Sequence, residues 1–273
     1  MARVTRFAPS PTGPLHLGHA YAALVAADRG DRLLLRIEDI DTPRCKPERE
    51  AAIYEDLQWL GLRYETPVMR QSSRMPAYRA ALDRLSALGL TYACTCTRSD
   101  IRAALSAPQE GVIGPDGPIY PGTCRNLHQP AGAIRLDIAA AMARVGTVSF
   151  TETGANAGRN CFDMPRMTDE IGDIVLARRD IGTSYHLSVV VDDAAQGITE
   201  VTRGEDLFDA TQIHVLLQRL LGLPTPHYHH HRLIRDDQGK RLAKRDDARA
   251  LSKYRAEGAT PADIRRLVGL PKG

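Results

Sequence analysis

The sequence predicts an α/β fold with a parallel sheet that is split by an inserted subdomain. Three observations predict it. The chain opens as strand, turn, helix and strand, later apolar segments supply further strands and helices, and a glycine- and proline-rich region with clustered cysteines interrupts them. A strand–helix–strand unit favours a parallel sheet. A chain of 273 residues is long enough for one large domain carrying an insert.

The opening unit follows from its apolar segments and its turn residues. Val4 to Ala8 is a short apolar strand that stops at Pro9. A proline- and glycine-containing turn leads into an alanine- and leucine-rich helix, which Gly30 ends. The expected elements are a strand over 4–8, a turn over 10–14, a helix over 15–29 and a strand over 32–37.

The later elements follow from the same signals. Helices are expected over 48–60, 77–88, 99–105, 209–221 and 259–268, and strands over 173–178, 187–191 and 227–234. The sequence therefore predicts a nucleotide-binding α/β domain formed by residues 1–90 and 171–250, an insert over 91–170 and a short helical extension over 251–273.

Composition limits the class of protein. Hydrophobic residues make up 43% of the chain, enough for a sizeable core, and the formal net charge of +3 does not by itself indicate a nucleic-acid partner. The N-terminus has no apolar signal core, and no stretch is long enough to span a membrane. We therefore expect a cytoplasmic protein, with a monomer as the default. The odd count of 5 cysteines argues against a complete disulfide framework.

A pair of histidines lies where the predicted turn meets the first helix. In the segment HLGH at 16–19, His16 and His19 are spaced so that both can face one ligand. The free N–H groups and positive dipole end of a helix N-terminus favour a phosphate, and Gly18 lets a nucleotide approach the backbone. The segment suits attack on the α-phosphate of ATP. The alternative is two histidines beside a turn with no ligand.

A basic loop follows the last predicted strand. Residues 235–245 read RDDQGKRLAKR, a polar segment that ends in basic side chains. Such a loop can close over a triphosphate and compensate the charge of pyrophosphate. The alternative is a solvated run of charges, which the sequence of this loop alone does not exclude.

Several segments in a fixed order add a family resemblance. They are RFAPSPTG at 6–13, HLGH at 16–19, RIEDID at 36–41, VDD at 191–193, RGEDL at 203–207 and RLAKR at 241–245. HLGH resembles the HIGH motif of class I aminoacyl-tRNA synthetases, and RLAKR resembles their KMSKS loop. The other segments are similar to the glutamyl- and glutaminyl-specific members. The whole set resembles the stand-alone glutamyl-Q tRNA(Asp) synthetases, which implies a Rossmann-like nucleotide-binding domain.

Two of these segments depart from the family pattern. Leu17 replaces isoleucine, a near-isosteric change. In the basic loop, Arg241, Ala243 and Arg245 replace a lysine and two serines, and the loss of the central hydroxyl removes one possible phosphate contact. Lys244 remains at the position of the lysine that contacts the ATP phosphates, so the resemblance implies that activity survives.

The resemblance also implies the residues of the site. It implies that His16, His19 and Lys244 stabilise the phosphate charge, with magnesium as the counterion. The implied ATP contacts are His16, Gly18, His19, Arg241 and Lys244, and the implied glutamate contacts are Arg6, Phe7, Ala8, Pro9, Ser10, Glu38, Tyr185 and Arg203. Glu38 would receive the ammonium group. A carboxylate needs a bidentate arginine, and Arg6 and Arg203 both stay open as the partner of the side-chain carboxylate.

The cysteine cluster predicts a structural zinc site. Cys94, Cys96 and Cys124 can meet at one tetrahedral ion and stabilise an insert too small for much core of its own. His128 is the ordinary choice for the fourth ligand, whereas the resemblance points to Tyr120. Three buried free thiols are the alternative.

The resemblance implies a function as well. It implies that glutamate is activated as an adenylate and transferred to the queuosine base in the anticodon of tRNA(Asp). Only residues 246–273 follow the basic loop, so no anticodon-binding domain is expected. The alternatives are a truncated glutamyl-tRNA synthetase that charges a tRNA 3′ end, another nucleotidylyltransferase, and a non-catalytic tRNA-binding paralogue.

Overall fold

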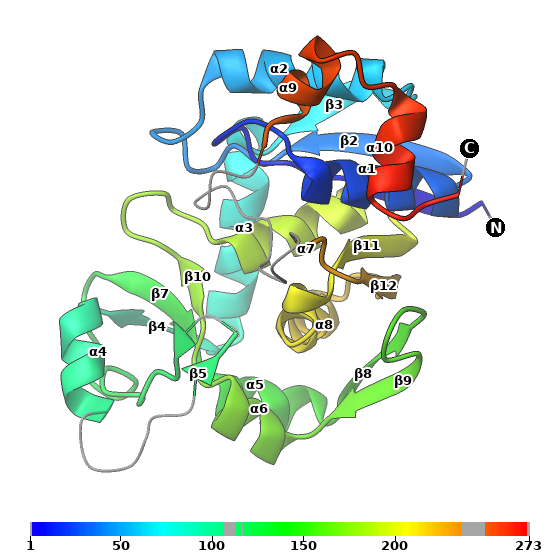
Figure 1. Ribbon diagram of the computed structural model, residues 1–273. Helices are drawn as coiled ribbons and strands as arrows, with labels where there is room; N and C mark the ends of the chain where they lie inside the picture. Colours follow the sequence, from blue (N-terminus) through cyan, green and yellow to red (C-terminus); the bar gives the residue numbers. More distant parts are fainter. Residues whose placement is uncertain (1, 106–112, 116, 236–248, 272–273) are drawn as a thin grey trace.

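The opening of the chain forms a parallel sheet (Figure 1). The computed structural model describes residues 2–105, 113–115, 117–235 and 249–271. Strands β1 (Val4–Phe7), β2 (Arg32–Ile37) and β3 (Glu65–Arg70) are parallel and lie in that order. Helices α1 (Leu17–Arg29) and α2 (Pro47–Trp59) connect them. The predicted strand–helix–strand unit is confirmed, and β3 is a strand that the sequence pattern did not predict.

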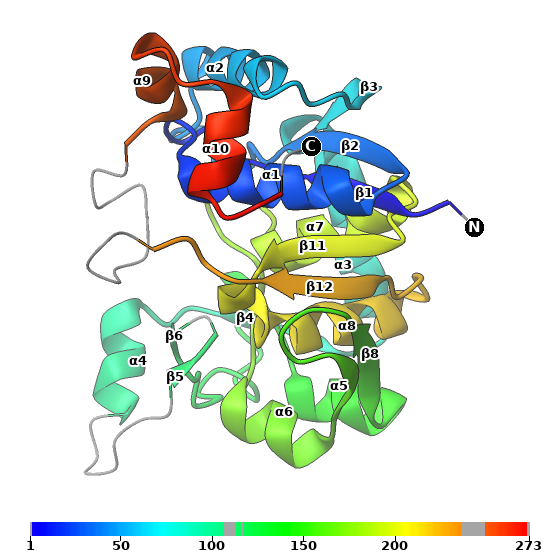
Figure 2. The ribbon, with the colours of Figure 1, turned by 45° about the vertical axis from the view of Figure 1, so that its right-hand side comes forward.

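A second sheet continues the first. Its order is β11 (Glu200–Gly204), β12 (His227–His231), β8 (Val148–Glu152) and β9 (Gly158–Phe162). The β11–β12 and β12–β8 pairs are parallel, and β9 is antiparallel to β8. Thr199 N donates to the Val4 carbonyl at 3.0 Å, which places β11 beside β1, and Figure 2 shows β1, β11 and β12 side by side. Helix α8 (Ala210–Leu221) connects β11 to β12.

The predicted strand over 187–191 is wrong, because these residues lie inside helix α7 (Tyr185–Ala195). Ser184 caps this helix by accepting a hydrogen bond from Leu187 N. The apolar run is buried between α3 (Met75–Ala87), which follows the short 3₁₀ helix η1 (Gln71–Arg74), and α8. A short, fully buried apolar run looks the same in a strand and in a buried helix, which explains the error.

A third, antiparallel sheet contains β10 (Val175–Ala177), β7 (Ala133–Leu136) and β4 (Thr91–Cys94) in that order. Around it lie α4 (Arg98–Leu105) and the hairpin of β5 (Ile113–Gly114) and β6 (Gly117–Pro118). Strand pairing crosses the expected boundary at 170 in both directions, since β10 pairs with β7 and β8 pairs with β12. The division into catalytic domain and insert stays a prediction.

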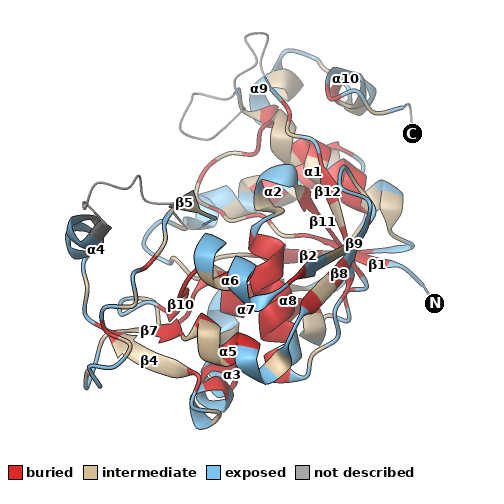
Figure 3. Ribbon diagram, turned by 90° about the horizontal axis from the view of Figure 1, so that it is seen from below, coloured by how far each residue is buried: buried red, intermediate tan, exposed pale blue. Residues whose placement is uncertain are grey.

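The largest core joins these parts. Leu136, Phe150, Phe162, Leu216 and Tyr228 are among its buried residues, so helices α5 (Ile138–Val145) and α6 (Met164–Glu170) share one core with α8. Figure 3 shows the buried residues concentrated in α7, α8 and the strands, whereas α4 is mostly exposed. No helix in the described ranges is long and apolar enough to cross a membrane.

The end of the described chain packs on the first sheet. Helices α9 (Leu251–Ala256) and α10 (Pro261–Leu267) place Leu251 and Ile264 in the core formed by β1, β2, α1 and α2. The 3₁₀ helix η2 (Glu205–Leu207) lies between β11 and α8. The chain from Arg249 onward is therefore held on the same sheet from which α1 begins.

Candidate active site

His16 caps the N-terminus of helix α1, and the side chain of His19 completes the cap by binding the backbone of His16. His16 Nδ1 accepts a hydrogen bond from Gly18 N at 3.1 Å, and His19 Nδ1 accepts one from His16 N at 3.1 Å. Because both Nδ1 atoms accept, the neutral form of each ring carries its proton on Nε2. Each histidine thus has a fixed Nε2–H donor at a helix N-terminus, an arrangement suited to a phosphate.

Gly18 is fitted closely to this arrangement. A Cβ atom added there would lie 3.0 Å from His16 Cε1 and 3.1 Å from His16 Nδ1. These contacts are tighter than most real Cβ contacts, so a larger residue at this position would push on the capping imidazole of His16. The expected ATP contact at Gly18 remains a prediction.

The basic loop falls outside the described residues, which stop at Arg235 and resume at Arg249. The predictions for Arg241 and Lys244 therefore lie in a part of the chain that the structure does not describe. The chain that follows is held at the histidines: Ala250 forms a β-bridge with His16, and Leu251 N donates to the Leu15 carbonyl at 2.8 Å. The described chain that resumes at Arg249 is thus attached where α1 begins.

Arg6 and Glu38 belong to one buried ionic network. Asp193 on α7 accepts from Arg6 Nε at 3.0 Å and from Arg36 Nη1 at 2.6 Å. Arg36 is fully buried and extends to Glu38 Oε1 at 3.2 Å. Arg6 also donates to the Thr202 carbonyl at 2.9 Å. One carboxylate therefore orients two guanidinium groups, and the second of them orients Glu38.

The charges in this network set the protonation states. Burial alone would raise the pKa of Asp193, but attraction by Arg6 and Arg36 outweighs it and holds that pKa below its usual value. For Glu38 the balance is reversed: burial raises its pKa in spite of attraction by Arg36 and Arg6. An incoming ammonium group would place a positive charge beside Glu38 and so favour its ionised form.

Arg203 is buried in a different environment, made of neutral side chains. Its Nε donates to His230 Nε2 at 3.1 Å and its Nη1 to His214 Nδ1 at 2.9 Å. Its Nη2 donates to Thr211 Oγ1 at 2.5 Å. Arg203 is 6% exposed, yet no carboxylate of the described chain lies within ion-pair distance of it.

The two histidines are kept neutral by burial and by Arg203 itself. Burial, with repulsion by Arg203, lowers the pKa of His214 far below its usual value. The same causes lower the pKa of His230 to about 4. His230 Nδ1 donates a hydrogen bond to Glu152 Oε2, and His214 Nε2 donates to His186 Nδ1 at 3.0 Å. These contacts fix the orientation of Arg203 without a carboxylate directly on its guanidinium group. The acid of this network, Glu152, lies behind His230, and in spite of burial its pKa is lowered by hydrogen bonds from His230.

Tyr185, the first residue of α7, lies between the two groups. Its ring centroid is 5.6 Å from that of His214, and burial raises its pKa while the charges of Arg203 and Glu38 act on it. Tyr185, Glu38 and Ser10 line a cleft of about 660 Å³. The predicted glutamate residues Arg6, Glu38, Tyr185 and Arg203 are therefore brought together by β1, β2, α7 and β11.

The remaining predicted glutamate residues lie on the chain between β1 and α1. The side chain of Phe7 packs into the core with Leu15 and Leu35, so it faces away from the cleft. The Pro9 carbonyl accepts from Glu38 N at 3.0 Å and so helps to place Glu38. Ala8 is half-buried, and its predicted contact with glutamate stays a prediction.

Comparison with known proteins decides the family. The model of the family "tRNA synthetases class I (E and Q), catalytic domain" matches residues 3–271. The chain belongs to this family. The glutamyl-Q tRNA(Asp) synthetase of Rhodobacter capsulatus is 62% identical over 98% of this chain and 100% of its own length. That of Albidiferax ferrireducens is 40% identical over 98% of this chain and 92% of its own.

Solved structures agree with this family. A glutamate tRNA ligase from Elizabethkingia meningosepticum superposes with a TM-score of 0.76 at 27% identity, covering 98% of this chain. This chain spans only 60% of the length of that ligase. Methionyl-tRNA synthetase of Mycobacterium tuberculosis, with a TM-score of 0.62 and 10% identity, shares the fold.

In this class I synthetase, sequence reasoning missed the residues that hold the predicted ones in place. Arg36 and Asp193 lie inside the family segments, but the pattern did not reveal that they join Arg6 to Glu38. His214 and His230 lie in no motif. A weak signal existed for His230, because a run of histidines on a predicted buried strand is unusual.

The cysteine cluster of the synthetase is assembled on β4 and the segment after β6. Ligand atoms of Cys94, Cys96 and Cys124 all lie within 4.8 Å of one another. The Tyr120 hydroxyl lies 3.4 Å from Cys94 Sγ and 3.5 Å from Cys96 Sγ, and it accepts from Cys124 N at 2.8 Å. His128 is not part of the metal-binding group found among the described residues.

The donor set fits a soft divalent cation. Burial would raise the pKa of Cys124, but hydrogen bonds from Tyr120 and from the Thr95 backbone lower it to about 6, which favours a thiolate. Burial also raises the pKa of Tyr120, so its phenol needs a nearby cation to lose its proton. Three sulfurs and a phenol oxygen at one point are a plausible structural zinc set.

Proposed function

We propose that this chain is an ATP-dependent ligase that activates L-glutamate as glutamyl-adenylate and transfers it to the queuosine base in the anticodon of tRNA(Asp). The relatives named glutamyl-Q tRNA(Asp) synthetase, similar over nearly the whole chain, support the substrate pair. The observation that carries glutamate is that Tyr185, which lines the cleft with Glu38, lies close enough to the buried Arg203 and Arg6 for their charges to act on its pKa.

Arg203 is the partner we assign to the side-chain carboxylate. Arg6 already shares its charge with Asp193, whereas Arg203 is surrounded by neutral donors and acceptors. A buried cation without an ion pair gains most when an anion binds, because the anion removes the cost of burying that charge. Glutamine has a neutral amide at the same place and would leave Arg203 unbalanced, so the pocket selects against it.

Glu38 is the partner of the ammonium group. Its pKa is raised by burial, and the positive charge of the substrate lowers the free energy of its ionised form. Binding of the ammonium and of the side-chain carboxylate at two separate fixed charges leaves the α-carboxylate as the group that can react. This defines which end of glutamate meets ATP.

The first chemical step is attack of the α-carboxylate on the α-phosphate of ATP. An oxygen–phosphorus bond forms, the bond to the bridging oxygen breaks, and pyrophosphate leaves. His16 and His19 offer their Nε2 donors to the phosphate that gains charge, a form of electrostatic stabilisation. Lys244 and Arg241 are proposed to contact the ATP phosphates, and magnesium bound with ATP would neutralise part of their charge.

The second step transfers the glutamyl group. A hydroxyl of the queuosine cyclopentene ring attacks the activated carbonyl, an ester bond forms, and AMP leaves with the electrons of the broken mixed-anhydride bond. The proton of the hydroxyl goes to solvent or to the leaving phosphate. Zinc on Cys94, Cys96, Tyr120 and Cys124 would supply a structural tie for the sheet of β4, β7 and β10, and takes no part in either step.

The experiment has two parts in one preparation. Glutamate-dependent ATP–pyrophosphate exchange is measured without tRNA, and labelled glutamate is then offered tRNA(Asp) with and without queuosine, and tRNA(Glu). Exchange with labelling of only the queuosine-containing tRNA(Asp) is expected. Labelling of tRNA(Glu) would instead favour a glutamyl-tRNA synthetase, the reading that the 27% identical glutamate tRNA ligase favours. Absence of exchange would refute the enzyme.

A further inference from the structure

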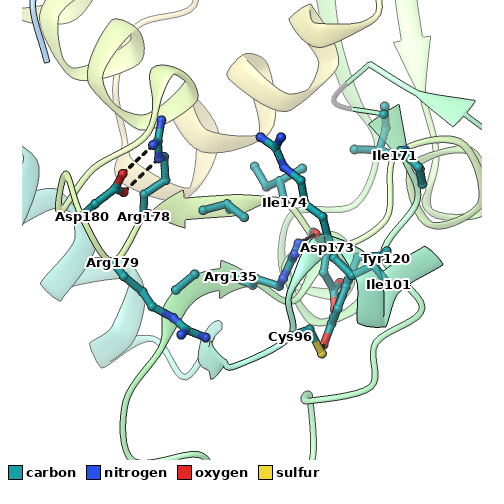
Figure 4. A pocket seen from close by; sticks show the side chains of 15 residues that line it. Cys96, Ile101, Tyr120, Arg135, Ile171, Asp173, Ile174, Arg178, Arg179 and Asp180 are labelled. Atoms are coloured by element: carbon teal, nitrogen blue, oxygen red, sulfur yellow. Dashed lines mark hydrogen bonds and ion pairs between the residues drawn. The ribbon is translucent and has the colours of Figure 1, made fainter. Parts of the chain in front are cut away.

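A second cavity lies beside the cleft, between the sheet of β4, β7 and β10 and helix α4 (Figure 4). Its volume is about 460 Å³. Its lining includes the apolar side chains of Ile101, Ile171 and Ile174. We call this cavity the side groove. An apolar wall of this kind suits a flat, weakly hydrated group such as a nucleobase.

One buried arginine lines the side groove. Arg135 is 8% exposed, donates from Nη1 to the Asp173 carbonyl at 2.7 Å and stacks on the Tyr120 ring with 3.8 Å between its guanidinium carbon and the ring centroid. Its Nε has no hydrogen-bond partner within the described chain. That Nε atom is itself buried, so Arg135 contributes a positive charge to the wall of the side groove and no exposed donor.

The rim of the side groove carries an excess of positive charge. Arg178 is offset by Asp180, through contacts of 3.0 and 2.6 Å, as Figure 4 shows. Arg179 donates only to the Cys94 carbonyl, at 3.1 Å, and has no ion pair with a described residue. Arg98 is exposed on α4 and lines the same rim. Exposed arginines without carboxylate partners suit phosphate oxygens.

The side groove is continuous with the cleft that contains Glu38 and Tyr185. Arg98, Val175 and Arg178 line both. Ligands in the two cavities would therefore lie next to each other along these shared residues. A polymer whose reacting unit enters the cleft has its neighbouring unit at the side groove.

We propose that the side groove binds a second nucleotide of the RNA that presents the acceptor nucleoside, with its base against the apolar wall and its phosphates at Arg179 and Arg98. This inference rests on the proposed function, since it needs an RNA substrate. Single-stranded RNA is recognised through splayed bases that pack against side chains and through phosphates held by basic groups. The side groove offers isoleucine side chains for the first and exposed arginines for the second. A free amino acid or ATP uses only the cleft.

Arg179→Glu is the variant that tests the proposal. Arg179 lines the side groove but not the cleft, and its side chain holds only one carbonyl. We expect kcat/KM for transfer to a queuosine-containing anticodon stem-loop RNA to fall about tenfold or more, with the salt dependence reduced by about one phosphate contact. Glutamate-dependent pyrophosphate exchange without RNA should keep its wild-type rate. Arg179→Lys should restore most of the transfer.

Arg144→Glu is the matched control, because Arg144 is an exposed arginine on α5 and lines neither cavity. It reverses the same charge and should change neither rate. Equal transfer by wild type, Arg179→Glu and Arg144→Glu would overturn the proposal. An equal loss in exchange and in transfer by Arg179→Glu would also overturn it, because the residue would then serve the cleft.

Abasic substitutions test the base itself. In the stem-loop RNA, one loop nucleotide at a time is made abasic beside the acceptor nucleoside. One position should cost wild type about tenfold in kcat/KM, the size expected for loss of one stacked base. Tolerance of every abasic position would contradict a base in the side groove. Failure of the proposed function looks different, because wild type would then modify no queuosine RNA at all while the exchange assay still reports on the cleft.

Discussion

Two buried arginines lie near Tyr185, which lines the cleft, and they differ in how their charge is balanced. Arg6, together with Arg36, is paired with Asp193 inside the protein. Arg203 has hydrogen bonds of equal quality but only to the neutral partners His214, His230 and Thr211. The first site is complete without a ligand, whereas the second becomes complete when an anion binds. From this difference we infer that the side-chain carboxylate of the substrate binds at the arginine that has no direct ion pair within the protein.

The largest expected effect comes from removing the unbalanced charge. We expect Arg203→Gln to lower kcat/KM for L-glutamate in pyrophosphate exchange about a thousandfold or more, since the carboxylate would be left unpaired in a buried site. The preference for glutamate over glutamine should collapse with it. Arg219→Gln, an exposed residue on α8, is the control and should behave as wild type. Retained selectivity in the Arg203 variant would break the comparison.

Removing the internal partner of the balanced site should act on stability first. Asp193→Asn leaves Arg6 and Arg36 buried without the negative charge that offsets them. The free energy of unfolding, measured with urea, should therefore fall by about 3–5 kcal/mol. The surface pair of Asp28 with Arg265 provides the control, and Asp28→Asn should cost at most about 1 kcal/mol. If the two variants unfolded alike, the Asp193 network would have no special role.

The neutral histidines around Arg203, His214 and His230, predict that the stability of the fold depends on pH. An unfolded histidine binds a proton near its ordinary pKa of about 6.5, but folded His230 does so only at about 4. Between these values the unfolded state holds more protons, so stability should fall as pH falls from about 6.5 towards 4. Urea unfolding across this pH range measures the effect, and we expect the free energy of unfolding of His230→Gln to depend less on pH. A free energy of unfolding that does not change with pH in the wild type would indicate that His230 is charged in the folded state.

The smallest effect on activity is expected at the cysteine cluster. Cys96→Ser, or removal of zinc with a chelator, should lower the thermal midpoint, because the cluster ties β4 to the segment around Tyr120. Glutamate-dependent exchange at low temperature should stay close to wild type, since neither Cys96 nor Tyr120 lines the cleft. Metal analysis should find zinc in wild type and little in the variant. Loss of exchange at full folding would assign the cluster a catalytic role.

The sequence predicted the residues of the candidate site, but not the residues that hold them in place. Arg6, Glu38, Tyr185 and Arg203 were expected from motifs, and the structure brings them together. His214 supports Arg203 across helix α8, far from any motif, and contacts of that kind depend on packing that no local pattern encodes. The open choice between Arg6 and Arg203 needed the charges around each, which only the folded chain provides.

The fold shows the same division between local and non-local information. The opening strand, turn, helix and strand were predicted because each element carries its own signals. Helix α7 was mistaken for a strand, because its apolar run is buried on all sides. Strand β10 lies within the predicted strand over 173–178, whereas β8 was not predicted, and its partner β12 lies far away in the sequence. The sequence also left Tyr120 and His128 open as the fourth ligand of the cysteine cluster, and the structure places the Tyr120 hydroxyl beside the sulfur atoms.

The most direct test of the difference between the two arginine sites is a crystal structure with L-glutamate bound. The side-chain carboxylate should lie within hydrogen-bond distance, about 3 Å, of the Arg203 guanidinium, with the ammonium group at Glu38. The Arg6–Asp193 pair should be unchanged. A carboxylate bound by Arg6, with Arg203 still surrounded only by neutral side chains, would contradict the claim that the unbalanced charge selects the substrate.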